Sequence, residues 1–137
     1  LEWMNIKSTF SHTLALDHNG DYLPFIPQDK IRLTAIIKKP ELNFFYDNSF
    51  SAGFLYAFEQ SHTGLFENQT AEYFTLNLQI STTLNIKSIP AFLNISVENL
   101  LNQSYTDHLS TLKDVGYFNM GRNITFGIRL NFNHILK

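Results

Sequence analysis

Acidic and histidine side chains occur close together at two places in the sequence where metal chemistry is conceivable. Asp17, His18 and Asp21 form the first group, and their carboxylate and imidazole groups could contact a metal ion or a ferric chelate. The same stretch contains Asn19-Gly20, a dipeptide typical of hairpin turns. We therefore favour a turn here, with the metal site as the alternative.

The second group is Glu59 and His62, which follow an apolar stretch and precede a polar one. We expect them to form a solvated rim rather than a ligand pair. Arg122 has a planar guanidinium that suits a carbonyl or carboxylate partner better than a lysine would, so we expect it to anchor a loop. No residue is assigned a catalytic role, and the identity of any metal stays open.

Composition excludes several classes of function. The sequence has no cysteine, which excludes disulfides, thiolate zinc sites and a cysteine nucleophile. It has 10 Lys and Arg against 12 Asp and Glu, so no basic surface for nucleic acid is expected. His12 is predicted on the apolar face of a strand, and no nucleophile with an adjacent base can be assembled. We predict neither an enzyme nor a cofactor site.

These side chains must be positioned by β-strands, because apolar and polar residues alternate along most of the chain. A period of two indicates strands with one apolar and one polar face. The clearest stretch is 123–132, whose apolar members are Ile124, Phe126, Ile128, Leu130 and Phe132. Six such stretches predict an all-β antiparallel meander, with strands at about 3–16, 30–38, 46–59, 73–84, 91–98 and 122–132.

The connections between these strands alternate in length. Stretches 39–43 and 85–89 are short, whereas 17–24, 61–71 and 100–121 are longer. Short turns at one end and long loops at the other are typical of outer-membrane barrels. The polar faces are rich in Ser, Thr, Asn and Gln, which suits a hydrated lumen, and the apolar faces suit lipid. The meander is thus predicted to be a segment of a transmembrane β-barrel; the alternative is a soluble β-sandwich or lipocalin-like ligand-binding module.

The C-terminal part of the chain contains motifs that together resemble a known family. Stretch 97–132 includes Glu98-Asn99-Leu100-Leu101-Asn102, then Tyr105, Asp107-His108-Leu109-Ser110 and Gly121-Arg122-Asn123. It resembles the last two strands of the TonB-dependent outer-membrane receptors. Stretch 22–33, with its Leu-Pro-x-Ile-Pro pattern, is similar to the entry into a late strand of the same family.

The resemblance implies a barrel of 22 strands with a plugged lumen. Residues 1–137 would be its C-terminal part, holding the last six strands and closing at about 122–132, with the N-terminal plug absent from this chain. The parent protein would import a scarce nutrient, such as a ferric siderophore, haem or metal complex, across the outer membrane of a Gram-negative bacterium. Its partners would be the remaining strands and plug, outer-membrane lipid, and TonB through the missing N-terminal region.

The implied orientation directs 17–24, 61–71 and 100–121 outward. The polar residues in or beside these loops are the candidate substrate-binding residues: Asp17, His18, Asp21, Glu59, His62, Asp107, His108 and Arg122. Asp107 and His108 belong to the family motif and are expected to be structural rather than ligand-binding. Aromatic residues near strand ends fit interfacial girdles, with ordinary β-propensity as the alternative: Trp3, Phe44, Phe45, Tyr46, Tyr73 and Phe74.

Overall fold

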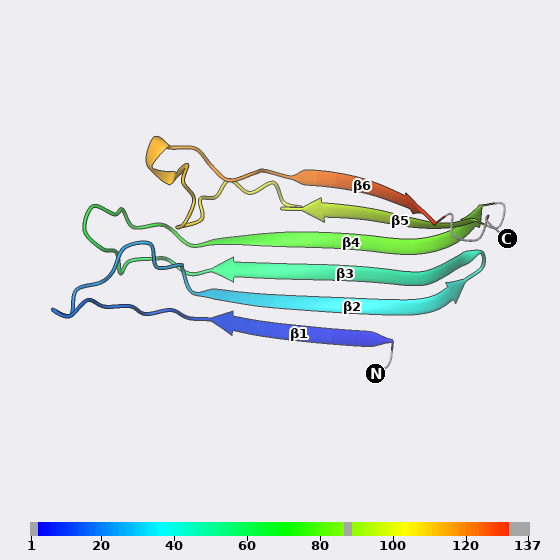
Figure 1. The fold of residues 1–137 in the computed structure, drawn as a ribbon, viewed down its shortest axis with the longest axis horizontal. Coiled ribbons are helices and arrows are strands. Elements are labelled where there is room, and N and C mark those ends of the chain that lie inside the picture. Colours follow the sequence, from blue (N-terminus) through cyan, green and yellow to red (C-terminus); the bar gives the residue numbers. More distant parts are fainter. Residues whose placement is uncertain (1–2, 87–88, 132–137) are drawn as a thin grey trace.

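A computed structural model describes residues 3–86 and 89–131. Its elements are β1 (Met4–Ser11), β2 (Lys30–Leu42), β3 (Phe45–Ala57), β4 (Tyr73–Ile86), β5 (Ile89–Glu98), the short 3-10 helix η1 (Lys113–Val115) and β6 (Asn123–Leu130). The strands form one antiparallel sheet in chain order, β1 to β6 (Figure 1). The predicted all-β meander of six strands is confirmed. Over the described ranges, no helix has the length and apolar character needed to cross a membrane.

Two strand boundaries differ from the prediction. The alternation of apolar and polar residues predicts a first strand that reaches residue 16. In the structure β1 ends at Ser11, and beyond it only Leu16 makes an isolated bridge, to Tyr22. β1 ends there because its partner β2 begins at Lys30, opposite Ser11. β6 runs from Asn123 to Leu130, and the predicted last strand residue, Phe132, lies outside the described residues.

The register aligns the alternation across the whole sheet. Residues opposite one another in a ladder point to the same face. One row reads Ile6, Ala35, Ala52, Leu78, Val97 and Ile124. The adjacent row reads Asn5, Ile36, Ser51, Gln79, Ser96 and Thr125. The sheet therefore has one apolar face and one mostly polar face.

A β-bulge interrupts this pattern near the turn between β2 and β3. The register of β3 against β4 shifts between Tyr46 and Ser49, which places Phe45 opposite Leu84 and Tyr46 opposite Thr83. Alternation alone predicts Tyr46 in the apolar row, and this prediction is wrong because a bulge inserts an extra residue into one strand. Asp47, inside the bulge, has a positive φ of 52°.

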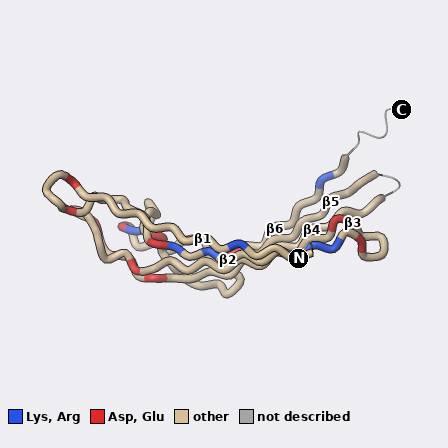
Figure 2. Tube along the Cα trace, turned by 90° about the horizontal axis from the view of Figure 1, so that it is seen from below, with Lys and Arg blue, Asp and Glu red and all other residues tan. Residues whose placement is uncertain are grey.

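The sheet is a single layer, gently curved when seen from its side (Figure 2). Within the described residues no second layer covers it, and large apolar side chains stay exposed, such as Ile6 at 67% and Phe126 at 65%. The buried hydrophobic residues are Ala57, Tyr73 and Ala91 alone among those described. The strands thus build no hydrophobic core of their own.

The connections are sorted by length, as predicted. Residues 43–44 join β2 and β3 at one end of the sheet, and only two positions of the sequence separate β4 from β5. The long connections all lie at the other end, and we name them loop A (12–29), loop B (58–72) and loop C (99–122) (Figure 1). β1 and β6 are the two edges and do not pair with each other.

Candidate functional site at the loop end of the sheet

The buried polar residues of the described chain gather where loops A, B and C meet the sheet. They are Gln28, Gln60, Thr70, Thr75, Asn99 and His108. Buried polar groups are expensive unless they are hydrogen-bonded, so their partners define how the loops are held.

Glu67 of loop B connects all three loops. Its carboxylate accepts the backbone N–H of Phe25 in loop A at 3.1 Å and that of Gly64 at 3.2 Å. Its Oε1 also lies 2.9 Å from Nε2 of His108 in loop C. Gly64 permits this approach, because a Cβ there would lie 2.5 Å from the backbone nitrogen of Pro24. A larger residue at this position would therefore push Pro24 of loop A away from loop B.

His108 is the most enclosed ionisable side chain of the network, with 0% of its side chain exposed. Its Nδ1 lies 2.8 Å from the Thr70 hydroxyl and 3.4 Å from Lys113 Nζ. The Nε2 contact with Glu67 is close but does not have hydrogen-bond geometry. Burial lowers the pKa of His108 and the nearby Lys113 ammonium lowers it further, against the opposing effect of Glu67. The imidazole is therefore neutral at pH 7.

Gln28, just before β2, ties loops A, B and C to one another. Its Nε2 donates to the carbonyls of Phe58 at 2.7 Å and Ala71 at 3.1 Å. Its Oε1 accepts the backbone N–H of His108 at 3.1 Å. All three partners are backbone groups, so the amide of Gln28 replaces ladder hydrogen bonds that the loops cannot make.

Asp107 anchors loop C to the sheet. It accepts hydrogen bonds from Lys30 Nζ of β2 and from the Tyr73 hydroxyl of β4, the latter at 2.6 Å. The Tyr73 ring stacks on Tyr105 with centroids 4.3 Å apart. Burial raises the pKa of Asp107, but the hydrogen bonds from Lys30 and Tyr73 outweigh it and hold the pKa below its ordinary value. Tyr73 is 5% exposed and thus points into this network, not toward a membrane interface.

Two asparagines and Arg122 hold the start of loop C, after β5, against its end, before β6. The Asn99 amide donates to the carbonyl of Gln103 at 2.8 Å and accepts its N–H at 2.9 Å. Asn102 Oδ1 accepts the backbone N–H of Arg122 at 2.9 Å. Arg122 Nε donates to the carbonyl of Leu100 at 2.9 Å, which confirms the prediction that this residue anchors a loop.

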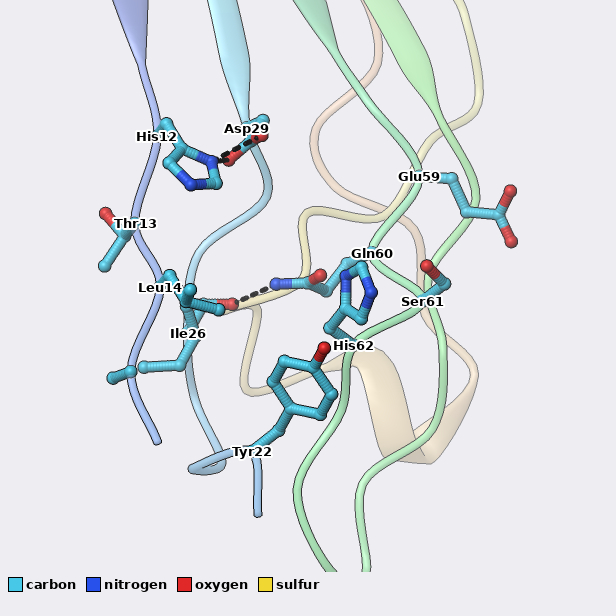
Figure 3. A pocket seen from close by; sticks show the side chains of 11 residues that line it. His12, Thr13, Leu14, Tyr22, Ile26, Asp29, Glu59, Gln60, Ser61 and His62 are labelled. Atoms are coloured by element: carbon cyan, nitrogen blue, oxygen red, sulfur yellow. Dashed lines mark hydrogen bonds and ion pairs between the residues drawn. The ribbon is translucent and has the colours of Figure 1, made fainter. Parts of the chain in front are cut away.

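A separate cavity of about 170 Å³ lies between loops A and B (Figure 3). On one side His12 Nδ1 contacts the Asp29 carboxylate at 2.8 Å. On the other, the His62 ring lies against Tyr22 with centroids 4.7 Å apart. Glu59 points away from these groups (Figure 3). His12 lies beyond the end of β1 and not in a strand as predicted, but its ring stacks on Phe10 of the apolar face with centroids 6.5 Å apart.

The tip of loop A is a hydrogen-bonded turn. Asp17 Oδ1 accepts the backbone N–H groups of Asn19 at 2.8 Å and Asp21 at 3.0 Å, in the manner of an Asx turn. The Asp21 bond in particular lowers the pKa of Asp17. His18 is exposed beside it. Among the described residues no group of three or more His, Asp and Glu could hold a metal ion, so the geometry supports the turn.

No protein-family model matches the chain. No curated protein matches it significantly either. The resemblance to TonB-dependent receptors thus depends on the motifs quoted above, and several of their residues, Asn99, Asn102, Tyr105, Asp107 and His108, are the ones that form the loop network.

The structure brings only some of the candidate residues together. Asp107 and His108 share one network, Glu59 and His62 line the cavity between loops A and B, and Asp17 with Asp21 forms the distant turn. Sequence reasoning missed Glu67, Gln28, Asp29 and Lys113. Gln28 directly follows the Leu-Pro-x-Ile-Pro pattern, which was the one available signal. The arrangement contains donors and acceptors that lock loops, and its chemistry is binding and positioning.

Proposed function

We propose that this chain is the C-terminal part of the barrel of an outer-membrane active-transport receptor that depends on TonB. The parent protein would import a scarce nutrient, such as a ferric siderophore, haem or a metal complex. The single observation that carries the proposal is the uncovered apolar face of the sheet.

An apolar face of this extent is costly in water. Apolar surface costs about 25 cal/mol per Å² when it is exposed to water. The rows from Met4 to Phe126 and from Ile6 to Ile124 contain no charged residue. In Figure 2 the acidic residues lie toward the two ends of the sheet, whereas Lys and Arg also occur along its middle. Hydrocarbon is the solvent that such a face tolerates, which supports a membrane-spanning position.

The two free edges support a larger barrel. Backbone groups at an open strand edge need hydrogen-bond partners inside a bilayer. About eight strands are the usual minimum for a closed barrel, so these six require more polypeptide. We infer that β1 and β6 pair with the remaining strands of the parent.

The loop network supports the family assignment in particular. Motif residues that are distant in sequence converge on one site: Asp107 contacts β2 and β4, and His108 contacts loops A and B through Gln28 and Glu67. In the proposed receptor the loop end faces outward and forms part of the nutrient's entry. Asp17, His18, Asp21, Glu59 and His62 are the candidate substrate contacts, while Asp107, His108 and Arg122 hold the loops in place.

The proposal is tested on the complete parent protein. It should fractionate with the outer membrane, need detergent for extraction, and migrate differently on a gel before and after boiling. A deletion strain should fail to grow on one scarce iron, metal or cofactor source. A complete protein that stays folded and monomeric in buffer without detergent would favour the soluble ligand-binding alternative.

A further inference from the structure

Loops B and C meet at the buried imidazole of His108, which has an acidic side chain on one side and a basic side chain on the other. His108 of loop C has Glu67 of loop B on its Nε2 side, at 2.9 Å. On its Nδ1 side lie the Thr70 hydroxyl and the Lys113 ammonium. Lys113 in turn donates to the carbonyl of Asn68 in loop B at 2.8 Å. Two contacts made by a charged side chain therefore join the loops, one on each side of the ring.

We propose that His108, Lys113 and Glu67 form an acid-sensitive latch between loops B and C. Protonation of His108 releases Lys113 from Asn68, so that the segment around η1 moves away from loop B. The Glu67 contact persists and keeps His108 itself in place. The device goes beyond nutrient import and does not depend on which nutrient is carried.

The release follows from the hydrogen-bonding capacity of imidazole. A neutral Nδ1 has a lone pair that accepts from the Thr70 hydroxyl and tolerates the Lys113 ammonium at 3.4 Å. A protonated Nδ1 has no lone pair and carries a hydrogen toward that ammonium. Two positive groups at this distance repel, and the shielded position of the ring limits screening by water. Lys113, on the short helix, is the partner that can move outward.

The other charged groups around the ring do not remove the repulsion between a protonated Nδ1 and Lys113. Asp107, next to His108 in the chain, is already engaged by Lys30 and Tyr73. Asp114 lines the cavity on the outer side of the same segment, without an ion pair to His108 among the described contacts. Glu67 is the one acidic group in contact with the ring among the described residues, and it faces Nε2 rather than Nδ1.

The pH range follows from the direction of the shift. Burial and Lys113 lower the pKa of His108 below its ordinary value of 6.5. A histidine with a lowered pKa stabilises the closed arrangement above pH 6.5, and this stabilisation is lost as the pH falls through the lower, folded-state pKa. Asp107 stays ionised in this range because its own pKa lies below 3.8.

Opening would uncover a cavity of about 350 Å³ between the three loops. Its apolar wall is formed by Phe25, Leu65, Phe66 and Leu109. Phe66 is fully exposed at its rim, and Leu65 is 84% exposed. Acid would thus change both the spacing of the outer loops and the apolar surface that they present.

The latch is tested by a distance between loops in the complete protein. Leu65 and Tyr117, both exposed, are replaced by Cys and spin-labelled in a background with no other cysteine. Double electron–electron resonance is recorded from about pH 8 to about pH 4.5. We expect one short distance at high pH and a longer one that becomes dominant below pH 6.5.

Matched variants decide between the latch and general acid loosening. His108→Gln and Lys113→Gln should each abolish the pH dependence of the distance, while His18→Gln, on exposed loop A, should leave it unchanged. An unchanged distance in the unsubstituted protein would overturn the proposal, as would a transition that survives in Lys113→Gln. If His108→Gln does not assemble, Lys113→Gln alone decides whether the latch exists, since its side chain lies at the edge of the network.

Discussion

The strand region and the loop end of this molecule differ in which side chains they bury. The strands expose apolar side chains, and the loop end buries polar ones. In the strands, large apolar residues such as Phe126 and Ile124 are about two-thirds exposed. At the loop end, polar residues such as Gln28 and His108 are 2% and 3% exposed. A soluble protein of ordinary design buries the first kind of residue and exposes the second.

The two regions therefore depend on different interactions for their stability. The strands depend on ladder hydrogen bonds and, in the proposed barrel, on an apolar solvent for one face. The loops depend on side chains that satisfy backbone groups, as Gln28 does for Phe58, Ala71 and His108. Substitutions in the two regions should therefore destabilise the protein in different ways. A substitution in a strand changes the polarity of the face that meets the solvent. A substitution in a loop leaves buried polar groups without a hydrogen-bond partner.

The largest effect is expected on the apolar face. Phe126→Arg should cost about 2–4 kcal/mol, the penalty of an arginine at the midplane of an outer-membrane barrel. The neighbouring Thr125→Arg, on the polar face, should cost much less. Urea unfolding of the complete protein in lipid vesicles measures the free energy of unfolding of both variants. Equal losses would contradict the proposal that one face meets hydrocarbon and the other meets water.

The next effect is expected at the centre of the loop network. Gln28→Leu should cost about 2 kcal/mol, because buried backbone groups of Phe58 and His108 lose their partner. Gln79→Leu is the matched control, since this glutamine is exposed on β4. Limited proteolysis should cut loops A to C faster in Gln28→Leu, with the strands unaffected. Equal cleavage in both variants would show that the network does not hold the loops.

A smaller effect is expected when Asp107 is protonated at low pH. Its pKa is lowered in the folded state, so it contributes stability above pH 3.8 that is lost as the pH falls toward the lower folded-state pKa. Protease resistance of loop C should decline over that range. Asp107→Asn should have a less stable loop C at neutral pH and lose this acid step, and a step that persists in the variant would assign it to another group.

The smallest effect is expected at the tip of loop A. Asp17→Ala removes three hydrogen bonds from an exposed turn, and the strands and the loop network make no use of them. Thermal unfolding should be nearly unchanged. A clear loss of nutrient binding in this variant would instead revive the ligand-site alternative for Asp17, His18 and Asp21.

The same division explains how much could be predicted from the sequence. Alternation predicts the strands because the register keeps apolar residues on one face from β1 to β6, and it is wrong at Tyr46, where a bulge changes the register. The predicted β1 is too long because its partner strand β2 begins at Lys30, opposite Ser11, and no strand pairs with the chain beyond that point.

The loop network has no periodic signal to reveal it. Gln28 and His108 are 80 positions apart, and they meet only because the meander brings loops A and C together over β2 to β4. Glu67 lies in a polar stretch where any acidic residue would look like solvent-exposed surface. Motif residues Asn99, Asp107 and Arg122 stand out in the sequence, but their hydrogen-bond partners depend on how the loops close.

The central claim is that the two faces of the sheet meet different solvents. It is tested by spin labels placed one at a time along β6, from 123 to 130, in the complete protein reconstituted in lipid vesicles. Oxygen concentrates in hydrocarbon, and a polar nickel chelate stays in water. We predict that oxygen reaches Ile124, Phe126 and Ile128 and that the chelate reaches the alternate positions, Thr125, Gly127 and Arg129. Labels at Ile124, Phe126 and Ile128 that neither reagent reaches, as in a protein core, would contradict the claim.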